Sequence, residues 1–170
     1  MSKTINVQIT IDAVGVANAY PNPSKDQNNP TGIGHQYGFM VATSNTMSGS
    51  GTGDLEFSAN VGDTVRFFAV SASNNFEDSV LLYGITRYSG DNVFGPFSSL
   101  TFTKNGVSPS GPSVLPAHIG SQQFWFYQSS VTNAGTEGYR IVFALYERDP
   151  NGNPTLFGYY QWDPTIQVRG

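Results

Sequence analysis

The chain has two histidines, His35 and His118, and each lies in or beside a stretch rich in proline and glycine. Two imidazoles brought together by a fold could ligate a metal ion or act as an acid and base pair. A zinc site needs further ligands at fixed positions, and the spacing of these histidines does not supply them. We therefore expect both histidines to be structural or solvent-exposed, and we predict no metal site.

Two groups of oxygen-bearing side chains could also do chemistry. Glu77 and Asp78 are adjacent, and neighbours in a strand point to opposite faces, so they are poorly placed as acid and base on one bond. Asp149, Asn151 and Asn153 alternate like the start of a calcium loop, but proline follows where such a loop has glycine, and the closing carboxylate is missing. We interpret the first group as a solvated turn and the second as a hairpin.

Sequence motifs of the common hydrolases and kinases are absent. The chain has no G-x-S-x-G elbow, no H-E-x-x-H zinc motif and no glycine-rich phosphate loop followed by Lys and Ser or Thr. It also has no cysteine, which excludes thiol catalysis and cysteine metal sites. We expect no enzymatic activity and no cofactor, with calcium left open because the loops are rich in Asn and Asp.

Aromatic side chains are abundant in this sequence and are of the greatest chemical interest. Phe124, Trp125, Phe126 and Tyr127 follow one another, and further aromatic residues crowd 159–162. Along a strand, alternate members of such a run face opposite ways, so some pack in the core while others can face water, a second subunit or a sugar ring. Sugar sites also need polar groups beside the apolar platform. Our candidate ligand-binding residues are Asn22, Asp26, Asn28, Asn29 and His35 in the first loop, with Trp125 and Trp162 as aromatic platforms.

Charge and hydropathy exclude several classes of partner. The net charge is −4, and the five arginines are scattered, so no basic stripe is available to neutralise nucleic-acid phosphates. The N-terminus lacks the apolar run of a signal peptide, and no apolar stretch approaches the roughly 20 residues of a membrane span. We expect no nucleic-acid partner, no membrane span and a cytoplasmic location, with non-classical export left open.

The elements that must position these residues are short strands. Ile5, Val7, Ile9 and Ile11 alternate with polar residues, which is the period of a half-buried strand. Similar segments, rich in β-branched and aromatic residues, are bounded by Gly, Asn, Asp, Ser or Pro. They span 5–11, 37–43, 54–60, 64–72, 79–88, 99–103, 123–131, 139–147 and 155–162. About nine such strands predict an all-β, jelly-roll-like antiparallel sandwich that forms one domain over residues 1–170.

Turns and two long loops complete the predicted fold. Asn151-Gly152 lies between two strand segments and predicts a hairpin, and Val61-Gly62-Asp63 predicts another. Residues 20–37 and 105–122 contain too much proline and glycine for a central strand, because proline cannot donate to the ladder. We expect both to be surface loops, and we expect the first, stiffened by proline, to hold binding groups.

Several of these segments resemble a known family. Four segments carry the resemblance. In chain order they are "NVQITIDA", "YPNPSKDQNNPTGIGHQYGFMVATS", "GTGDLEFSANVGDTVRFFAVSASNNFEDSVLLYGI" and "FGYYQWDP". This order is similar to that of the AidA/PixA family of bacterial inclusion body proteins. The resemblance implies a β-sandwich, quorum-sensing-regulated expression in host-associated bacteria and cytoplasmic crystalline inclusions. It supplies no catalytic residues.

One departure from the resemblance concerns methionine. Inclusion-forming members of that family are rich in methionine, whereas this chain has three, Met1, Met40 and Met47. A role as a methionine-rich storage protein is therefore disfavoured for this chain. Low charge and a flat aromatic surface still favour regular self-association.

Two functions from different classes follow. The first is self-assembly or partner binding by a non-enzymatic protein, which predicts a homo-oligomer formed through an exposed strand face carrying aromatics such as Tyr159 or Trp125. The alternative is a lectin-like glycan-binding module, with or without calcium, whose carbohydrate ligand would contact the first loop. Oligomer size and ligand identity are not determined by the sequence.

Overall fold

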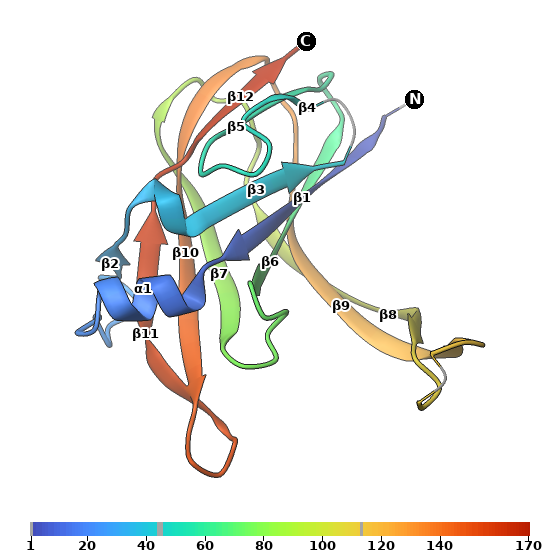
Figure 1. Cartoon of the computed structure of the whole chain (residues 1–170). Helices are drawn as coiled ribbons and strands as arrows, with labels where there is room; N and C mark the ends of the chain where they lie inside the picture. Colours follow the sequence, from blue (N-terminus) through green and yellow to red (C-terminus); the bar gives the residue numbers. More distant parts are fainter. Residues whose placement is uncertain (1, 44–45, 113) are drawn as a thin grey trace.

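Two mixed β-sheets face each other in the computed structural model, which describes residues 2–43, 46–112 and 114–170 (Figure 1). The first sheet has five strands in the order β3-β1-β6-β9-β8. Its bounds are β1 (Thr4–Ile11), β3 (Gly38–Ala42), β6 (Thr64–Ser71), β8 (Ser98–Ser108) and β9 (His118–Ser130). Strand β1, second in this order, pairs antiparallel with β3 and parallel with β6.

The second sheet runs in the order β2-β11-β10-β12-β5-β4, and β7 also pairs with β10. Its bounds are β2 (Thr31–Gly32), β4 (Thr46–Ser48), β5 (Leu55–Ser58), β7 (Ser79–Gly90), β10 (Gly135–Arg148), β11 (Pro154–Trp162) and β12 (Thr165–Arg169). β10 is the longest strand and pairs with β7, β11 and β12. It therefore holds this sheet together.

The core lies between the two sheets and follows the alternation seen in the sequence. In β1 the residues Ile5, Val7, Ile9 and Ile11 are buried, while the polar residues between them face outward. β10, β11 and β12 supply the opposite wall with aromatic and branched side chains. The largest fully buried side chains include Trp162, Tyr139, Tyr160, Phe57, Phe67 and Phe143. The predicted all-β sandwich is confirmed.

The nine predicted strands are all present, and three short ones were missed. These are β2, β4 and β12, of two, three and five residues, which are too short for a clear alternating pattern. The prediction of purely antiparallel pairing is wrong, because β1 with β6, β11 with β2 and β12 with β5 are parallel. Alternation reports that one face of a sheet is buried, and it carries no information about the direction of the neighbouring strand.

Of the two predicted hairpins, one is confirmed. Arg148 pairs with Pro154 across the β10–β11 turn, and Gly152 has φ of 82° there. The Asp149 carboxylate accepts the N–H groups of Asn151 and Asn153, both at 2.8 Å, and these hydrogen bonds lower the pKa of Asp149. The hairpin at residues 61–63 is wrong, because this turn carries the chain from β5 in one sheet to β6 in the other.

Two short helices were not predicted. Helix α1 (Ala13–Ala19) has only seven residues, so it shows no repeating apolar stripe. Its N-cap is Asp12, whose side chain accepts the Gly15 N–H at 2.9 Å. The 3-10 turn η1 (His35–Tyr37) follows β2. None of the helices in the described part of the chain has the length or apolar character needed to cross a membrane.

The first proline-rich segment, residues 20–37, follows the edge of the second sheet. Ser24 O accepts the Tyr159 N–H at 2.9 Å, and β2 pairs with Tyr160 and Gln161 of β11. The segment therefore covers an edge that would otherwise present unpaired backbone groups. Its prolines cannot donate on the outer side, which explains why so much proline is used here.

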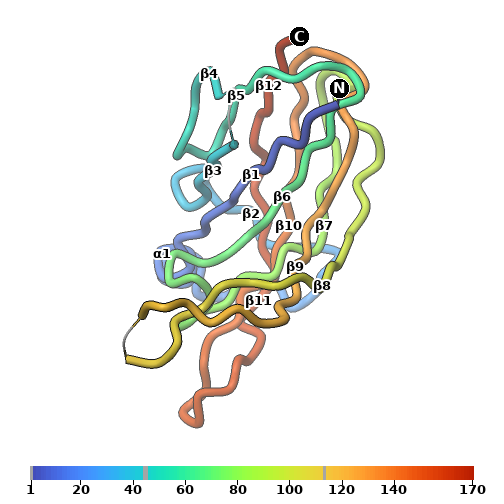
Figure 2. Tube along the Cα trace, turned by 90° about the vertical axis from the view of Figure 1, so that its right-hand side faces the viewer, coloured from blue at the N-terminus to red at the C-terminus, as the bar shows by residue number. Residues whose placement is uncertain are grey.

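The second predicted loop, residues 105–122, is shorter than expected. β8 extends to Ser108 and β9 begins at His118, so the strands pair through Asn105–Ser121 and out to Ser108–His118. The prolines lie beyond this pairing, between the strands, and Ser113 lies outside the described residues. Figures 1 and 2 show that the resulting hairpin stands clear of the rest of the molecule. We call residues 100–126 the arm and the rest of the two facing sheets the body.

Candidate functional site

The two faces of the arm differ because of the register between its strands. Phe102 pairs with Phe124, and Leu100 pairs with Phe126, so these side chains share one face. Trp125 pairs with Thr101 and lies on the other face. The phenylalanine face continues onto β6, where Arg66 pairs with Gln128. It is the outer face of the five-stranded sheet, since the next residue of β6, Phe67, is in the core.

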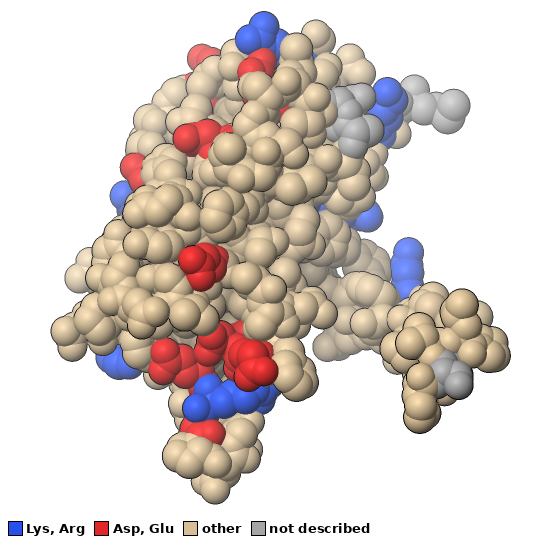
Figure 3. Space-filling view, viewed as in Figure 1, with Lys and Arg blue, Asp and Glu red and all other residues tan. Residues whose placement is uncertain are grey.

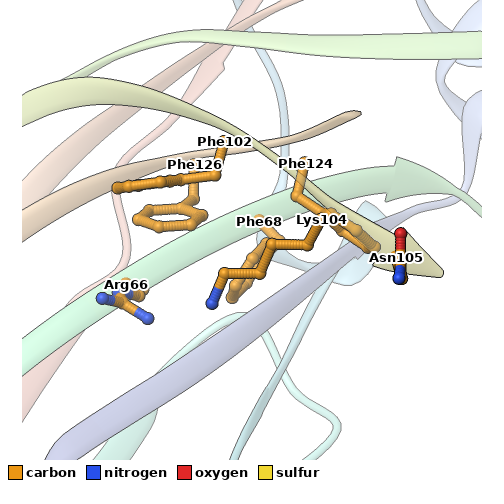
Figure 4. Close-up of a pocket in the computed structure, with 7 residues that line it drawn as sticks. All are labelled: Arg66, Phe68, Phe102, Lys104, Asn105, Phe124 and Phe126. Carbon is orange, nitrogen blue, oxygen red and sulfur yellow. The ribbon is translucent and has the colours of Figure 1, made fainter. Parts of the chain in front are cut away.

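A cavity of about 300 Å³ lies on this outer face, where the arm leaves the body. We call it the aromatic groove, and its lining is Arg66, Phe68, Phe102, Lys104, Asn105, Phe124 and Phe126 (Figure 4). The rings of Phe102 and Phe126 are stacked with centroids 5.6 Å apart, and Phe68 meets Phe126 edge-on at 5.3 Å. The groove is therefore largely apolar, with fixed ring positions.

The rim of the groove is cationic. The Arg66 guanidinium lies 4.6 Å from the centroid of Phe126, and its Nε donates to Gln128 Oε1 at 2.8 Å. Lys104 extends over the rings from β8 (Figure 4). Within the described part of the chain, neither Arg66 nor Lys104 takes part in an ion pair. The groove thus suits an apolar group that carries negative charge beside it.

The arm itself is apolar and almost uncharged. Between Asp91 and Glu137 the sequence has no acidic residue, and Lys104 is its only lysine or arginine. In Figure 3 the acidic side chains gather on the body, away from the arm. Large apolar side chains of the arm are exposed: Phe102 41%, Val107 72%, Val114 63%, Leu115 74%, Ile119 67% and Phe124 38%. By the register of the strands, Phe102 and Phe124 lie on one face of the arm and Val107 and Ile119 on the other, while Val114 and Leu115 lie at its tip.

The loop residues proposed as ligand contacts lie together on the surface but mostly serve the loop itself. Asn22, Asp26, Asn28 and Asn29 are exposed. Asp26 Oδ1 accepts the Asn28 N–H at 2.9 Å, and Asp26 O accepts the Asn29 N–H at 3.1 Å. These are the contacts of a turn in which a carboxylate replaces a backbone acceptor. A ligand role for these residues stays a prediction.

His35 is in a different setting from the loop residues. Its Nδ1 lies 3.2 Å from Asp54 Oδ2, and its Nε2 lies 3.4 Å from Asp163 Oδ1. Asp54 Oδ1 in turn accepts the Thr165 N–H at 2.7 Å, so the cluster links η1 to the start of β12. His118 begins β9 on the arm and pairs with Ser108. The structure therefore gives His35 a bridging position on the surface of the second sheet.

The two tryptophans are also placed differently from each other. Trp162 is 2% exposed and packs against Phe143 in the core, with its Nε1 donating to Gly53 O at 3.4 Å. Its indole is therefore not a surface platform beside the first loop, because the period of β11 turns it inward. Trp125 is half-buried on the inner side of the arm and meets Tyr127 edge-on. The residues we expected to form one ligand site thus occupy separate parts of the molecule.

Another cavity, of about 570 Å³, lies beside β7 and β10 and holds a buried carboxylate. Glu137 is 1% exposed, and its Oε2 accepts the N–H groups of Val93 at 2.5 Å and Phe94 at 3.2 Å. Arg87 Nε lies 3.6 Å from Glu137 Oε1. Burial, together with the nearby Glu137 carboxylate, raises the pKa of Tyr139. Glu137 thus anchors the segment before β8, and its oxygens face the protein.

Sequence reasoning missed most of the groove. The alternation of Phe124 and Phe126 with Trp125 was visible, but not which pair faces outward. Phe68, Phe102, Arg66 and Lys104 come from β6 and β8, and only the pairing of both strands with β9 brings them together. The one available signal was the absence of acidic residues around Lys104.

Comparison with known proteins gives two findings. The model of a family described as "PixA: Inclusion body protein" matches residues 3–168. The fold is similar to the crystal structure of an inclusion body protein of the PixA type from Burkholderia cenocepacia J2315, with a TM-score of 0.86 and 32% sequence identity. That similarity covers 99% of this chain and 97% of the other. A search of curated proteins returned no match.

Proposed function

The chain belongs to the PixA family of inclusion body proteins, and on that premise we propose that it acts without catalysis, by assembling with copies of itself through the arm. The observation that carries the proposal is the exposed apolar surface of the arm. Soluble monomers rarely expose large contiguous apolar patches, and those that do commonly use them for association. The arm carries exposed apolar side chains, and it projects from the body, so these side chains are accessible to a second molecule.

The backbone of the arm supports the same proposal. β8 is the last strand of its sheet, and β9 pairs with β6 only over Tyr127–Ser130, so both edges of the outer arm are open in the described structure. Open edges are templates for pairing with another chain, and proteins that avoid this place charges or proline along them. Here a single lysine and the prolines beyond the paired region are the only such residues.

The energetics of a two-stranded hairpin also favour a partner. A hairpin alone is at best marginally stable in water, because it has too little apolar area to bury. Contact with a second molecule would cover the phenylalanine face and hold the arm in one position. The proposed setting is the cytoplasm of a host-associated bacterium, with expression under quorum-sensing control. This setting is supported by the family resemblance alone.

An arm-shortened chain tests the proposal. Thr101 and Trp125 are cross-strand partners, so residues 102–124 can be replaced by Asn-Gly, a pair suited to a two-residue hairpin turn. Sedimentation velocity and light scattering are then recorded over a wide concentration range. We expect the average mass of the full chain to rise with concentration and that of the shortened chain to stay monomeric. Equal association of both chains, with unchanged circular dichroism, would show that the arm is not the contact.

Carbohydrate binding is a second candidate, favoured by one observation. The aromatic groove is lined by the exposed rings of Phe102 and Phe124 and also by Asn105, and sugars require such a combination of apolar platform and polar group. A glycan array screened with calcium and with a chelator separates the alternatives. Binding retained by the full chain and lost from the arm-shortened chain would favour the groove, and loss with chelator would identify calcium as a requirement.

A further inference from the structure

A turn on the body carries an apolar side chain that is unusually exposed. Residues 72–78 connect β6 to β7, and we call this segment the Phe76 turn. The phenyl ring of Phe76 is 72% exposed, the highest value of any aromatic side chain in the described structure. Glu77 is also exposed, and Asp78 is partly exposed. The turn therefore presents an aromatic ring with two carboxylates directly beside it.

The Phe76 turn is rigid. Asn74 and Asn75 have φ of 56° and 59°, and they are the only non-glycine residues with positive φ in the described chain. This left-handed conformation is unfavourable for most residues with a side chain, and asparagine tolerates it best. Asn75 Oδ1 holds the turn by accepting the N–H groups of Ser71 at 2.9 Å and Val80 at 3.0 Å. Backbone strain of this kind concentrates at functional sites.

Hydrogen bonds hold the backbone on both sides of the ring. Arg148 Nε donates to Phe76 O at 2.7 Å, and the Glu77 N–H donates to Ser73 Oγ at 3.1 Å. The backbone that carries the ring is therefore tied to the body, and the side chain itself is exposed. A backbone that is already held in one place loses little conformational entropy on binding, which favours an anchor residue at this position.

The aromatic groove and the Phe76 turn are complementary, because the groove is an apolar cavity with a cationic rim and the turn presents an aromatic ring beside carboxylates. The groove offers an apolar cavity of about 300 Å³ with Arg66 and Lys104 at its rim. The turn offers one aromatic ring with Glu77 and Asp78 beside it. Other charges near the turn are Glu147, whose pKa is raised by burial and by Asp78, together with Lys25 and Arg148. Two cations and three carboxylates leave the surroundings of the ring net negative.

We propose that Phe76 of one molecule inserts into the aromatic groove of a second copy of this chain. The inference rests on the proposed function and specifies the contact that performs it. Phe76 and the groove are different surfaces of the same chain, so the contact is head-to-tail and leaves one free turn and one free groove at the ends of every open assembly. Head-to-tail contacts close into rings or extend as open filaments. An open array is the arrangement that an inclusion requires.

The first test removes the ring. Phe76→Ala deletes an exposed side chain and leaves the backbone contacts of the turn intact, so the fold is retained. We expect the association constant measured by sedimentation at high protein concentration to fall about tenfold or more, as for a buried aromatic anchor at an interface. The matched control is Val61→Ala, which truncates another exposed apolar residue, 70% exposed, in the β5–β6 turn. We expect the control to associate like the unmodified chain.

A mixing experiment then tests the head-to-tail arrangement. Phe76→Ala retains the groove, and Phe124→Ala damages the groove but retains the turn. We expect each variant alone to associate weakly and an equimolar mixture to form a species of two chains that does not grow further. A mixture that associates no better than either variant overturns the pairing of turn and groove, even if both single variants are impaired.

Charge reversal tests the complementarity. We expect Glu77→Lys and Lys104→Glu each to weaken association severalfold, and the double variant Glu77→Lys with Lys104→Glu to recover part of it. No recovery in the double variant overturns the electrostatic part of the proposal.

These experiments also distinguish failure of the Phe76 contact from failure of the proposed function. If Phe76→Ala associates normally while the arm-shortened chain does not, the Phe76 contact is wrong and assembly through the arm stands. If the unmodified chain stays monomeric, assembly itself is wrong.

Discussion

The body and the arm are built from the same kind of strand but bury their aromatic residues differently. In the body, alternate residues of each strand meet the opposite sheet, and Trp162, Phe143 and Tyr160 fill the space between. In the arm, Phe102 and Phe124 lie on the outer face of the five-stranded sheet, which no second layer covers in the described structure, and they remain exposed at 41% and 38%. An alternating pattern therefore forms a core only where another layer covers it. Where the layer is missing, the same pattern leaves apolar side chains exposed.

The backbone shows the same contrast. In the body, β1 and β10 have strands on both sides, and even the edge of β11 is covered by the first loop. In the arm, β8 and the outer half of β9 have only each other. The chain covers a sheet edge in one place and leaves a long one open in another.

The largest expected effect comes from the two tryptophans, one in each region. Trp162→Ala removes a side chain that is 2% exposed, and we expect it to reduce the free energy of unfolding by about 3–5 kcal/mol. Trp125→Ala is the matched substitution at the base of the arm, where the ring is half-buried. We expect a smaller loss there, because part of the Trp125 side chain is exposed and less apolar area is lost. Urea unfolding followed by circular dichroism measures both.

A reversed order would break the comparison. If Trp125→Ala cost as much as Trp162→Ala, the arm would be an integral part of the folded core. Its projection would then contribute to stability and could not be assigned to contact alone. A smaller loss for both, with an unchanged denaturant slope, would instead indicate that the body tolerates a cavity at Trp162 by relaxation.

An intermediate effect is expected at Asp63, a buried carboxylate of the body. It is 2% exposed and accepts the N–H groups of Lys3 at 2.7 Å and Asn60 at 2.9 Å. These hydrogen bonds lower the pKa of Asp63 below its ordinary value. A carboxyl whose pKa is lower in the folded state stabilises the fold above its unfolded pKa of about 4, and this stability is lost as the pH falls through the folded pKa.

We therefore expect Asp63→Asn to cost about 1–3 kcal/mol at neutral pH, since the amide can accept one of the two N–H groups with its oxygen but not the other. The loss relative to the unmodified chain should shrink as the pH falls below the unfolded pKa of about 4, and it should be smallest below the lowered folded pKa of Asp63. Asp149→Asn in the exposed β10–β11 turn is the control, with a smaller expected effect. A loss at Asp63 that is independent of pH would contradict the assignment.

The body was largely predictable from the sequence because its signals are local. The alternation of Ile5, Val7, Ile9 and Ile11 depends only on neighbours in the chain, as does the Asn151-Gly152 turn. The direction of strand pairing was not predictable, because β1 and β6 are separated by about 50 residues and their parallel pairing leaves no local trace. The turn at residues 61–63 was misjudged for the same reason, since a crossover between sheets and a hairpin use similar residues.

The candidate site was mostly unpredictable. The aromatic groove needs three strands in register, and a shift of one residue would exchange Phe124 and Phe126 for Trp125 and Tyr127. Trp162 was expected at a surface and lies in the core for the corresponding reason. Phe76 was visible as an apolar residue among polar ones, but only the backbone conformation of Asn74 and Asn75 shows that the turn is held rigid with the ring outward.

The smallest expected effect on stability is at the tip of the arm, and it sharpens the comparison most. Leu115 is 74% exposed, so we expect Leu115→Ser to change the free energy of unfolding by less than about 0.5 kcal/mol. The same substitution at Leu145, which is fully buried in β10, should cost several times more. In sedimentation at high concentration we expect Leu115→Ser to reduce self-association, because the proposed function places the arm against a second molecule. A variant that leaves both stability and association unchanged would restrict the contact to the phenylalanine face at the base of the arm. One that destabilises the chain as much as Leu145→Ser would show that the tip packs against the body and that arm and body are one structural unit.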